Sequence, residues 1–189
     1  MKAAVRERFG PPEVVELREV ERPVPADDEV VVRIHASSIN IADWYGVLGR
    51  PYVGRGATGL RGPKEPRLGT DYAGRVEAVG QEVTQFQPGD EVFGARTGAW
   101  AEYVAAKADR GIVLKPANVT FEEAAAVPVA AITALQAIRD KGQLRPGQKV
   151  LINGASGGVG PFAVSIAKAL GGDVTAVCST KNVENARSL

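Results

Sequence analysis

The sequence predicts an α/β fold class combined with a β-rich part, arranged as two consecutive domains. A short apolar run at residues 150–152, typical of a strand buried on both faces of a parallel sheet, is followed by a glycine-rich turn and then by an amphipathic segment. This gives the order strand, turn, helix. The preceding part of the chain contains many short β-type runs separated by glycine and proline, a pattern typical of a small barrel or sandwich. With 189 residues the chain is long enough for one or two such domains.

The composition excludes several classes of function. A net charge of +1 gives no electrostatic reason to expect binding to nucleic acid or to an anionic membrane. The single cysteine excludes a disulfide framework and a cysteine-based zinc site. No apolar run has the length of a transmembrane helix, and the first residues lack the hydrophobic region of a signal peptide. We therefore expect a cytoplasmic protein with no nucleic-acid or membrane partner.

The β-rich part is expected to consist of short strands at residues 2–8, 14–20, 29–36, 71–80, 91–94, 99–107 and 112–114. A short helix is expected to follow Asn40, which is a suitable N-cap, and to reach Leu48. Residues 50–67 are rich in Gly, Pro and Arg and have almost no periodic pattern. We interpret this segment as a functional or mobile loop, with a plain disordered insertion as the alternative.

The alanine-rich residues 122–141 predict helix, with a capping box at Thr120 and Glu123. Pro128 should split this stretch into two helices, because proline lacks an N–H group and its ring clashes with the preceding turn. A turn at residues 144–148 then leads into the strand before the glycine-rich turn.

The glycine-rich turn indicates binding of a dinucleotide. The free N–H groups at the start of the following helix form a site for a pyrophosphate, and a second β-type run at residues 173–178 completes a βαβ unit. The match to G-x-G-x-x-G is incomplete, since Ala155 stands where the first glycine is expected, although Gly154 beside it can relieve the turn. The alternative is that the glycines only make the turn. The candidate cofactor residues of the turn are Ala155, Ser156, Gly157, Gly158, Val159 and Gly160.

The end of the second strand of this unit predicts NADPH rather than NADH. An NAD site usually offers an acid about 20 residues after the glycines, to hold the ribose 2′-hydroxyl. Here the strand is followed by Ser179, Thr180 and Lys181, and no acid occurs before Glu184. Two hydroxyls and a cation suit a 2′-phosphate better than a diol. The alternative is that Lys181 is a solvated residue at the start of a helix capped by Thr180.

Several segments, taken in order, resemble the medium-chain dehydrogenase/reductase family. They are Ser38-Ile39-Asn40-Ile41-Ala42-Asp43-Trp44, Gly69-Thr70-Asp71-Tyr72-Ala73-Gly74, Gly89-Asp90-Glu91-Val92, Ala131-Ile132-Thr133-Ala134 and the turn at residues 153–160. The resemblance implies a GroES-like β-barrel-type catalytic domain at residues 1–122, followed by a Rossmann βαβ domain at residues 123–189 that is incomplete at its C-terminus. It also implies an active site in the cleft between the domains and a homodimer of the full-length form.

The departures from the zinc-dependent members of that family indicate a particular branch. Where those members hold the catalytic metal with a Cys and a Gly-His-Glu segment, this chain has Ser37-Ser38 and Gly69-Thr70-Asp71. A hydroxyl and a lone carboxylate do not replace the thiolate and imidazole that zinc prefers, so no metal site is predicted. The chain resembles the zinc-independent quinone oxidoreductase branch, which implies NADPH-dependent reduction of quinones or α,β-unsaturated carbonyls.

The same resemblance supplies the candidate catalytic residues. Asn40 and Tyr52 are expected to contact cofactor or substrate, with Asp43 orienting them, and Thr133 is placed against the nicotinamide end of the cofactor. The alternatives are purely structural: an N-cap role for Asn40, a first-turn acid favoured by the helix dipole for Asp43, and loop packing for Tyr52.

Two other functions remain open at this point. The first is a non-catalytic NADP(H)-binding module that acts as a redox sensor or binds a partner. The second is a dehydrogenase of small alcohols, which the lack of zinc ligands disfavours. A dinucleotide-binding sheet needs two halves, and the sequence supplies the strands of one. We therefore expect the 189 residues to be the N-terminal part of a longer reductase that by themselves bind NADPH poorly and turn over little.

Overall fold

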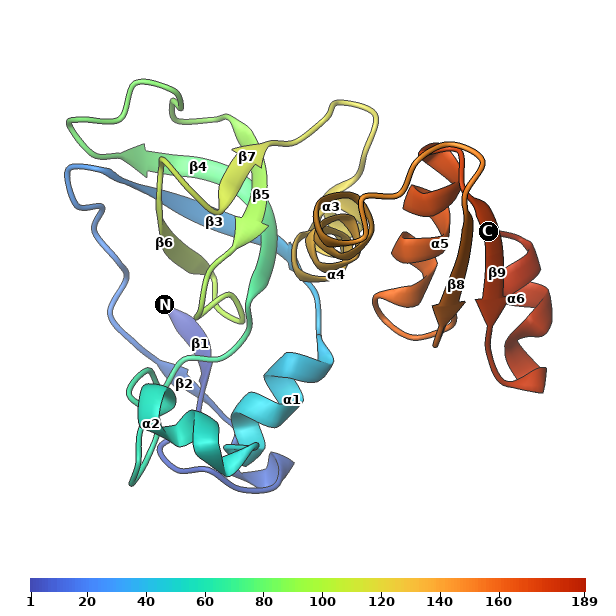
Figure 1. The fold of residues 1–189 in the computed structure, drawn as a ribbon. Helices are drawn as coiled ribbons and strands as arrows, with labels where there is room; N and C mark the ends of the chain where they lie inside the picture. Colours follow the sequence, from blue (N-terminus) through green and yellow to red (C-terminus); the bar gives the residue numbers. More distant parts are fainter. The chain divides into compact units, whose positions relative to one another are not determined.

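The chain folds into two units, Met1–Pro128 and Val129–Leu189 (Figure 1). The structure is a computed structural model, and it describes all 189 residues apart from the side chain at position 57. The domain boundary predicted between residues 122 and 123 stays a prediction.

The first unit is built on a curled five-stranded antiparallel sheet with the strand order β6-β3-β4-β5-β7 (Figure 1). Its strands are β3 (Glu29–Ser37), β4 (Asp71–Val79), β5 (Glu91–Ala95), β6 (Tyr103–Lys107) and β7 (Ile112–Leu114). All five had been predicted, with ends that differ by a few residues. The register between β3 and β4 pairs Ser37 with Tyr72 and so brings the ends of these two long strands together.

The core of this unit lies against the sheet. Alternate residues of a strand point to the same face, and on β3 the inward residues include Val30 and Val32. They pack with side chains from the other strands and connections, namely Tyr72, Val76, Val92, Ala99, Val104, Ala106, Ala108 and Ile112. The face of β3 that carries Val30, Val32 and the partly buried Ile34 is therefore the core face.

A separate two-stranded sheet pairs β1 (Lys2–Val5) with β2 (Glu16–Glu19) in antiparallel orientation. The expected turn between them contains a short 3₁₀ helix, η1 (Pro12–Val14), which begins at a proline whose missing N–H costs nothing there. Isolated bridges from Ala3 to Ala101 and from Val5 to Arg67 tie β1 to the rest of the unit.

Helix α1 (Ile41–Leu48) occupies the predicted position after Asn40 and ends at Gly49, which adopts φ 63°. A left-handed residue of this kind is a common helix stop, and glycine adopts it without a Cβ clash. Residues 50–67, where no element was predicted, contain the short helices η2 (Tyr52–Gly54) and α2 (Arg55–Thr58). The end of this segment is held by a distant strand, because the Arg6 amide donates to the Pro66 carbonyl at 2.8 Å and a bridge joins Arg67 to Val5.

Helix α3 (Phe121–Ala125) confirms the predicted capping box. The Glu123 amide donates to Thr120 Oγ1 at 3.1 Å, and the Thr120 amide donates to Glu123 Oε2 at 2.8 Å. Hydrogen bonds from the backbone amide and the side chain of Thr120 hold the pKa of the Glu123 carboxyl below its usual value. The buried Ala124 and Ala125 pack on Ala73 of β4, so α3 covers part of the sheet.

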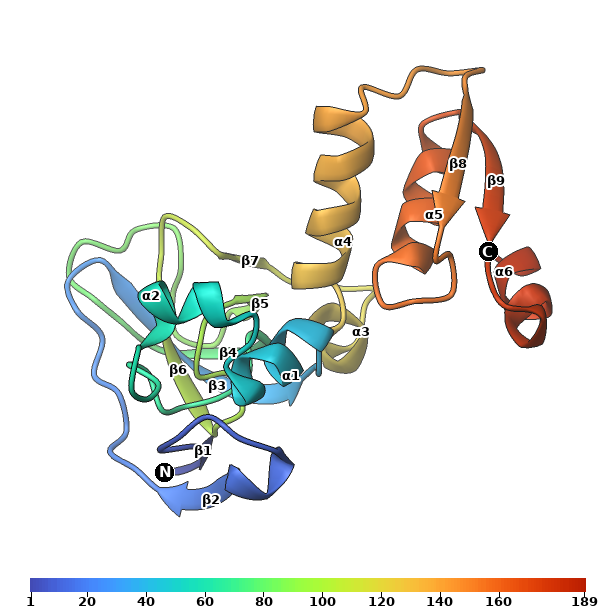
Figure 2. The same cartoon turned by 60° about the horizontal axis from the view of Figure 1, so that its bottom comes forward.

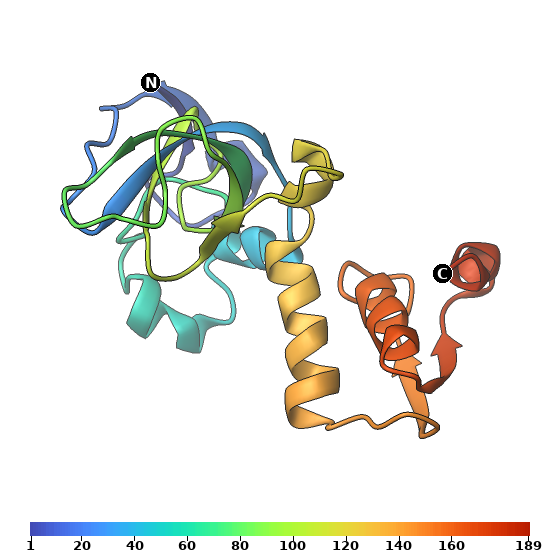
Figure 3. The same ribbon diagram turned by 90° about the horizontal axis from the view of Figure 1, so that it is seen from above.

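Helix α4 (Pro128–Leu135) begins at the last residue of the first unit and continues into the second. The second unit then contains a π-helical turn η3 (Gln136–Lys141), β8 (Lys149–Asn153), α5 (Gly160–Ala169), β9 (Asp173–Val177), η4 (Thr180–Asn182) and α6 (Val183–Arg187). Figure 3 shows α4 running on into η3 without a break. Strands β8 and β9 are parallel, with Lys149 opposite Asp173, and α5 connects them (Figure 2). The predicted βαβ segment and the split at Pro128 are both confirmed.

One burial prediction for the second unit is wrong. The run Val150-Leu151-Ile152 predicted a strand buried on both faces, but Leu151 is 67% exposed. Successive strand residues face opposite ways, so Val150 and Ile152 pack with Ala163 and Ala167 of α5 while Leu151 points to the other face. Within the described residues α5 covers only one face of this two-stranded sheet.

Candidate functional site

The turn between β8 and α5 presents unused N–H groups at the start of the helix. Gly154 adopts φ 76°, which confirms it as the residue that relieves the turn. The amides of Gly154 and Ala155 both donate to the Val177 carbonyl at 3.0 Å, and the Gly157 amide donates to the Gly154 carbonyl at 2.9 Å. Within the part of the chain that the structure describes, the amides of the remaining turn residues, Ser156, Gly158 and Val159, donate to no protein atom.

The three later glycines of the turn have different surroundings. A Cβ on Gly160 would lie 2.2 Å from the Gly154 carbonyl oxygen, so this glycine is required by packing. A Cβ on Gly157 would lie 3.3 Å from the same oxygen, and one on Gly158 would meet no atom within 4 Å. The open space at Gly158, next to unused amides at a helix N-terminus, fits a phosphate group.

The residues after β9 lie beside this turn. Ser179, Thr180 and Lys181 are exposed, and Thr180 and Lys181 are the first residues of η4. The N-cap residue of η4 is Ser179, not Thr180 as the alternative interpretation assumed. Asn182 Nδ2 donates to Ser156 Oγ at 3.0 Å and to Ser179 Oγ at 3.1 Å, and thereby connects the two halves of the candidate cofactor site. Sequence reasoning did not select Asn182.

Thr133, the remaining candidate in the second unit, lies on α4. Its Oγ1 donates to the Val129 carbonyl at 2.6 Å, a backbone bond that uses the only hydrogen of the hydroxyl. As placed, Thr133 offers a ligand only the lone pairs of Oγ1.

In the first unit, Asn40 is the N-cap residue of α1, its side chain makes no capping hydrogen bond, and Asp43 lies in the first turn of the helix. The Asn40 amide donates to Asp43 Oδ2 at 2.8 Å, and Thr70 Oγ1 donates to Asp43 Oδ1 at 2.9 Å. Asp43 is only 7% exposed, and each of its two carboxylate oxygens accepts one of these hydrogen bonds. The structural alternatives for Asn40 and Asp43 are therefore real roles of these residues, and they leave a second role for the Asn40 side chain open.

Asp71, which sequence reasoning did not select, holds the Asn40 side chain. It begins β4 and is fully buried. Its Oδ2 accepts hydrogen bonds from Asn40 Nδ2 at 3.0 Å and from Ser38 Oγ at 3.1 Å, and its backbone carbonyl accepts one from Ser37 Oγ at 2.6 Å. The sequence signal for Asp71 is an acid directly before Tyr72 and Ala73 at the start of a strand, where an unpaired buried charge would be costly.

These bonds fix the polarity of the Asn40 amide group. Asn40 Nδ2 also donates to Ser38 Oγ at 3.3 Å, so both of its hydrogens are used. A carboxylate accepts hydrogen bonds and donates none, which orients Nδ2 rather than Oδ1 towards Asp71. The atom that Asn40 can offer to a ligand is consequently the acceptor Oδ1.

Tyr52 lies apart from this network, on η2. Its side chain is 63% exposed, and the guanidinium groups of Arg55 and Arg50 lie 4.9 and 5.7 Å from the centre of its ring. No contact recorded among the described residues joins Tyr52 to Asn40 or Asp43. The structure therefore connects Asn40 with Asp43 and leaves Tyr52 separate.

The described residues contain no group of three or more His, Cys, Asp or Glu side chains that could hold a metal ion. His35 stacks on Phe121, with the ring centres 4.5 Å apart. None of the helices in the described part of the chain is both long and apolar enough to cross a membrane.

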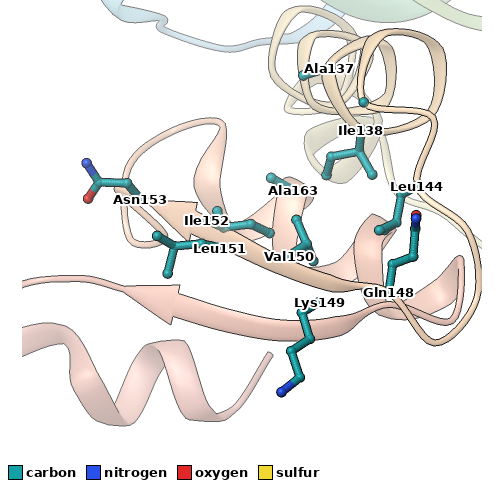
Figure 4. Close-up of a pocket in the computed structure, with 11 residues that line it drawn as sticks. Ala137, Ile138, Leu144, Gln148, Lys149, Val150, Leu151, Ile152, Asn153 and Ala163 are labelled. Carbon is teal, nitrogen blue, oxygen red and sulfur yellow. The ribbon is translucent and has the colours of Figure 1, made fainter.

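A pocket of about 590 Å³ lies along β8 (Figure 4). Its lining is mainly apolar and includes Ile138 and Leu144 together with the residues of β8. None of the predicted cofactor residues lines it, so this pocket is separate from the candidate phosphate site.

Comparison with known proteins agrees with these observations. Residues 26–117 match the family model described as "Alcohol dehydrogenase GroES-like domain". The quinone oxidoreductase of Sus scrofa is 36% identical over 181 residues, which cover 94% of this chain and 53% of that protein. The chain thus spans about half the length of the curated relatives it matches.

Solved structures show the same similarity. The Escherichia coli quinone oxidoreductase complexed with NADPH matches with a TM-score of 0.86 and 30% identity, over 100% of this chain and 56% of that one. The CurK enoyl reductase matches with a TM-score of 0.91 and 28% identity, over 99% of this chain and 57% of that one.

Proposed function

Because the chain belongs to the medium-chain dehydrogenase/reductase family, in its quinone oxidoreductase branch, we propose that it is part of an NADPH-dependent, zinc-independent reductase of quinones or α,β-unsaturated carbonyls. Its first unit contains the curled GroES-like sheet and its second a short parallel βαβ segment. That this segment opens a Rossmann domain is part of the proposal. The observation that carries it is the β8–α5 turn, with open space at Gly158 beside unused amides.

The residues of the second unit fit NADPH. The unused amides of Ser156, Gly158 and Val159 would bind the pyrophosphate, while Gly154, Ala155, Gly157 and Gly160 shape the turn. Ser179, Thr180 and Lys181 would hold the 2′-phosphate through two hydroxyls and a cation. When bound, the cofactor supplies the hydride.

The residues of the first unit would orient the reactants and stabilise charge. Asn40 acts as an acceptor through Oδ1, and Asp43 and Asp71 hold its backbone and its side chain in place. The exposed Tyr52 hydroxyl is the candidate donor to a substrate carbonyl oxygen. Tyr72 is unsuitable for that role, because burial raises the pKa of its hydroxyl and removes it from the surface. Thr133 would accept from the nicotinamide end of the cofactor through its free lone pairs.

The test is an activity assay of the protein in its full natural length. We expect saturable oxidation of NADPH that depends on an added quinone or enone, and a lower rate with NADH. Stoichiometric NADPH binding without turnover across a panel of quinones and enones would instead favour a non-catalytic binding module. Oxidation of small alcohols that increases with added zinc would favour a dehydrogenase and contradict the proposal.

A further inference from the structure

The side chain of Asn182 bridges two separate segments of the second unit. Its Nδ2 donates to Ser156 Oγ at 3.0 Å, in the turn after β8, and to Ser179 Oγ at 3.1 Å, just after β9. The Asn182 backbone amide also donates to the Ser179 carbonyl at 2.9 Å, which holds the bridging residue close to the end of β9. Asn182 thus contacts both serines of the candidate cofactor site.

Helix stability does not explain this arrangement. Asn182 is the N-cap residue of α6, a position where asparagine is favoured because its side chain can accept from the helix N–H groups. Here the side chain makes no capping hydrogen bond, and its amide group donates to the two serines instead.

The polarity of the two bonds determines what the serines can offer. Both hydrogens of Nδ2 are donated, so each serine accepts with a lone pair of Oγ and keeps its own hydrogen. In the opposite amide orientation the two hydroxyls would donate to Oδ1 and present only lone pairs. Phosphate oxygens are acceptors, so the polarity with Nδ2 towards the serines is the one that leaves both hydroxyls able to bind phosphate.

The surroundings of the bridge are those of a ligand site. A pocket of about 300 Å³ lies against it, lined by Ala155, Ser156, Pro161, Asn182, Asn185, Ala186, Ser188 and Leu189. Ser156 belongs to the turn with unused amides, and Ser179 is two residues before Lys181. The donors on both sides of Asn182, with Lys181 next to it in the chain, therefore favour an anionic ligand.

We infer that Asn182 is a positioning residue for NADPH that sets Ser156 and Ser179 as hydrogen-bond donors, to the pyrophosphate and to the 2′-phosphate respectively. This inference rests on the proposed cofactor site, but it concerns binding and does not require that the protein reduces a quinone or an enone. Asn182 should therefore contribute to the preference for NADPH over NADH, because NADPH carries a 2′-phosphate and NADH does not.

The substitution Asn182→Asp tests the polarity directly. A carboxylate of the same shape accepts only, so it would take the hydrogens of both serines and also repel a phosphate. Titration of the full-length protein with NADPH, NADH and 2′,5′-ADP, followed by NMR chemical shifts so that weak binding is measured, should show NADPH and 2′,5′-ADP weakened roughly 30-fold or more. NADH should lose less, and Asn182→Ala should weaken NADPH only about threefold to tenfold.

The controls separate positioning from simple attachment of α6. Asn118→Ala makes the same change at an exposed asparagine of the first unit whose side chain makes no recorded hydrogen bond, and it should bind NADPH like the wild type. In a Ser156→Ala/Ser179→Ala background, Asn182→Asp should lose the part of its effect that acts through the serine hydroxyls. Equal losses for NADPH and NADH in Asn182→Ala and Asn182→Asp, in step with a lower unfolding temperature, would overturn the inference. Wild-type affinity in Asn182→Asp, or no binding by the wild type, would do the same.

Discussion

At the scale of single residues, partners elsewhere in the fold decide what a side chain can do. Asn40 has a donor and an acceptor, but Ser38 and Asp71 use both hydrogens of its Nδ2 and leave the acceptor. Ser38 in turn donates to the same Asp71 oxygen at 3.1 Å. A substitution in this network therefore changes the hydrogen-bond polarity of its neighbours as well as its own.

Exchange of the two residue types tests the acceptor role of Asn40. Asn40→Asp alone places two carboxylates about as close as the present 3.0 Å bond and should lower kcat/KM. Adding Asp71→Asn restores the network in reverse, because the amide at position 71 then donates to position 40 and to Ser38. We expect the single variant to lose about tenfold in kcat/KM and the double variant to recover to within about threefold of wild type.

The outcome is decided by steady-state kinetics and NADPH affinity of the full-length protein, with unfolding temperatures as a check on folding. A double variant as inactive as Asn40→Ala would mean that Asn40 acts as a donor, contrary to our assignment.

Lys181 carries the prediction of cofactor preference. Lys181→Glu replaces a charge-assisted phosphate contact by repulsion and should weaken NADPH roughly 10- to 100-fold, with little change for NADH. Lys168→Glu, on the exposed surface of α5, is the matched control with the same change of charge. Dissociation constants for both cofactors provide the measurement, and equal losses for NADPH and NADH would remove Lys181 from the 2′-phosphate site.

At the scale of elements, the turn between β8 and α5 assigns a different task to each of its glycines. Gly154 supplies a positive φ of 76°, and Gly160 allows α5 to approach the backbone of residues 154 and 155. Gly158 meets neither of these two requirements, because its φ is not positive and a Cβ there would meet no atom within 4 Å. In our interpretation Gly158 faces the ligand, because the fold leaves open space beside it and does not itself require a glycine there.

Two alanine substitutions in this turn should separate stability from binding. Gly160→Ala pushes a Cβ to 2.2 Å from a carbonyl oxygen, and we expect a loss of roughly 1–3 kcal/mol in the free energy of unfolding. Gly158→Ala should change stability by less than about 0.5 kcal/mol. It should nevertheless weaken NADPH by about tenfold, because the methyl group takes space from the pyrophosphate.

Thermal unfolding measures the stability of both variants, and titration with NADPH measures their affinity for the cofactor. Unchanged NADPH affinity in Gly158→Ala would place the pyrophosphate away from this turn.

At the scale of the whole molecule, the candidate site residues fall in two units. The first unit holds Asn40, Asp43 and Tyr52, and the second holds the glycine-rich turn and the residues after β9. Where zinc-dependent relatives are expected to hold a metal, the first unit has Ser37, Ser38 and Thr70 bonded to Asp71 and Asp43. These hydroxyls are poor zinc ligands and are already engaged by carboxylates or carbonyls.

The full-length protein should therefore contain no catalytic zinc. Elemental analysis after purification without added metal is expected to find far less than one zinc per chain. The variant Thr70→His serves as the comparison for the wild type, because it adds an imidazole but still leaves too few ligands for a closed zinc site. Near-stoichiometric zinc in the wild type that survives dialysis would contradict the zinc-independent assignment.

Local patterns in the sequence were sufficient for the elements, and contacts between distant segments were needed for the site. The strand–turn–helix of β8 and α5, the helix after Asn40 and the capping box at Thr120 depend on residues a few positions apart, where periodicity and backbone preference act. Asp71 meets Ser38 and Asn40 only because the β3–β4 register places Ser37 opposite Tyr72, and Asn182 meets Ser156 only because β9 runs beside β8. Leu151 is likewise apolar in the sequence, and whether a second layer covers it is a property of the fold. Hydrogen-bond polarity at Asn40 and Asn182 was therefore decided by the tertiary structure, since a side chain's remaining donor or acceptor is known only when all its partners are in place.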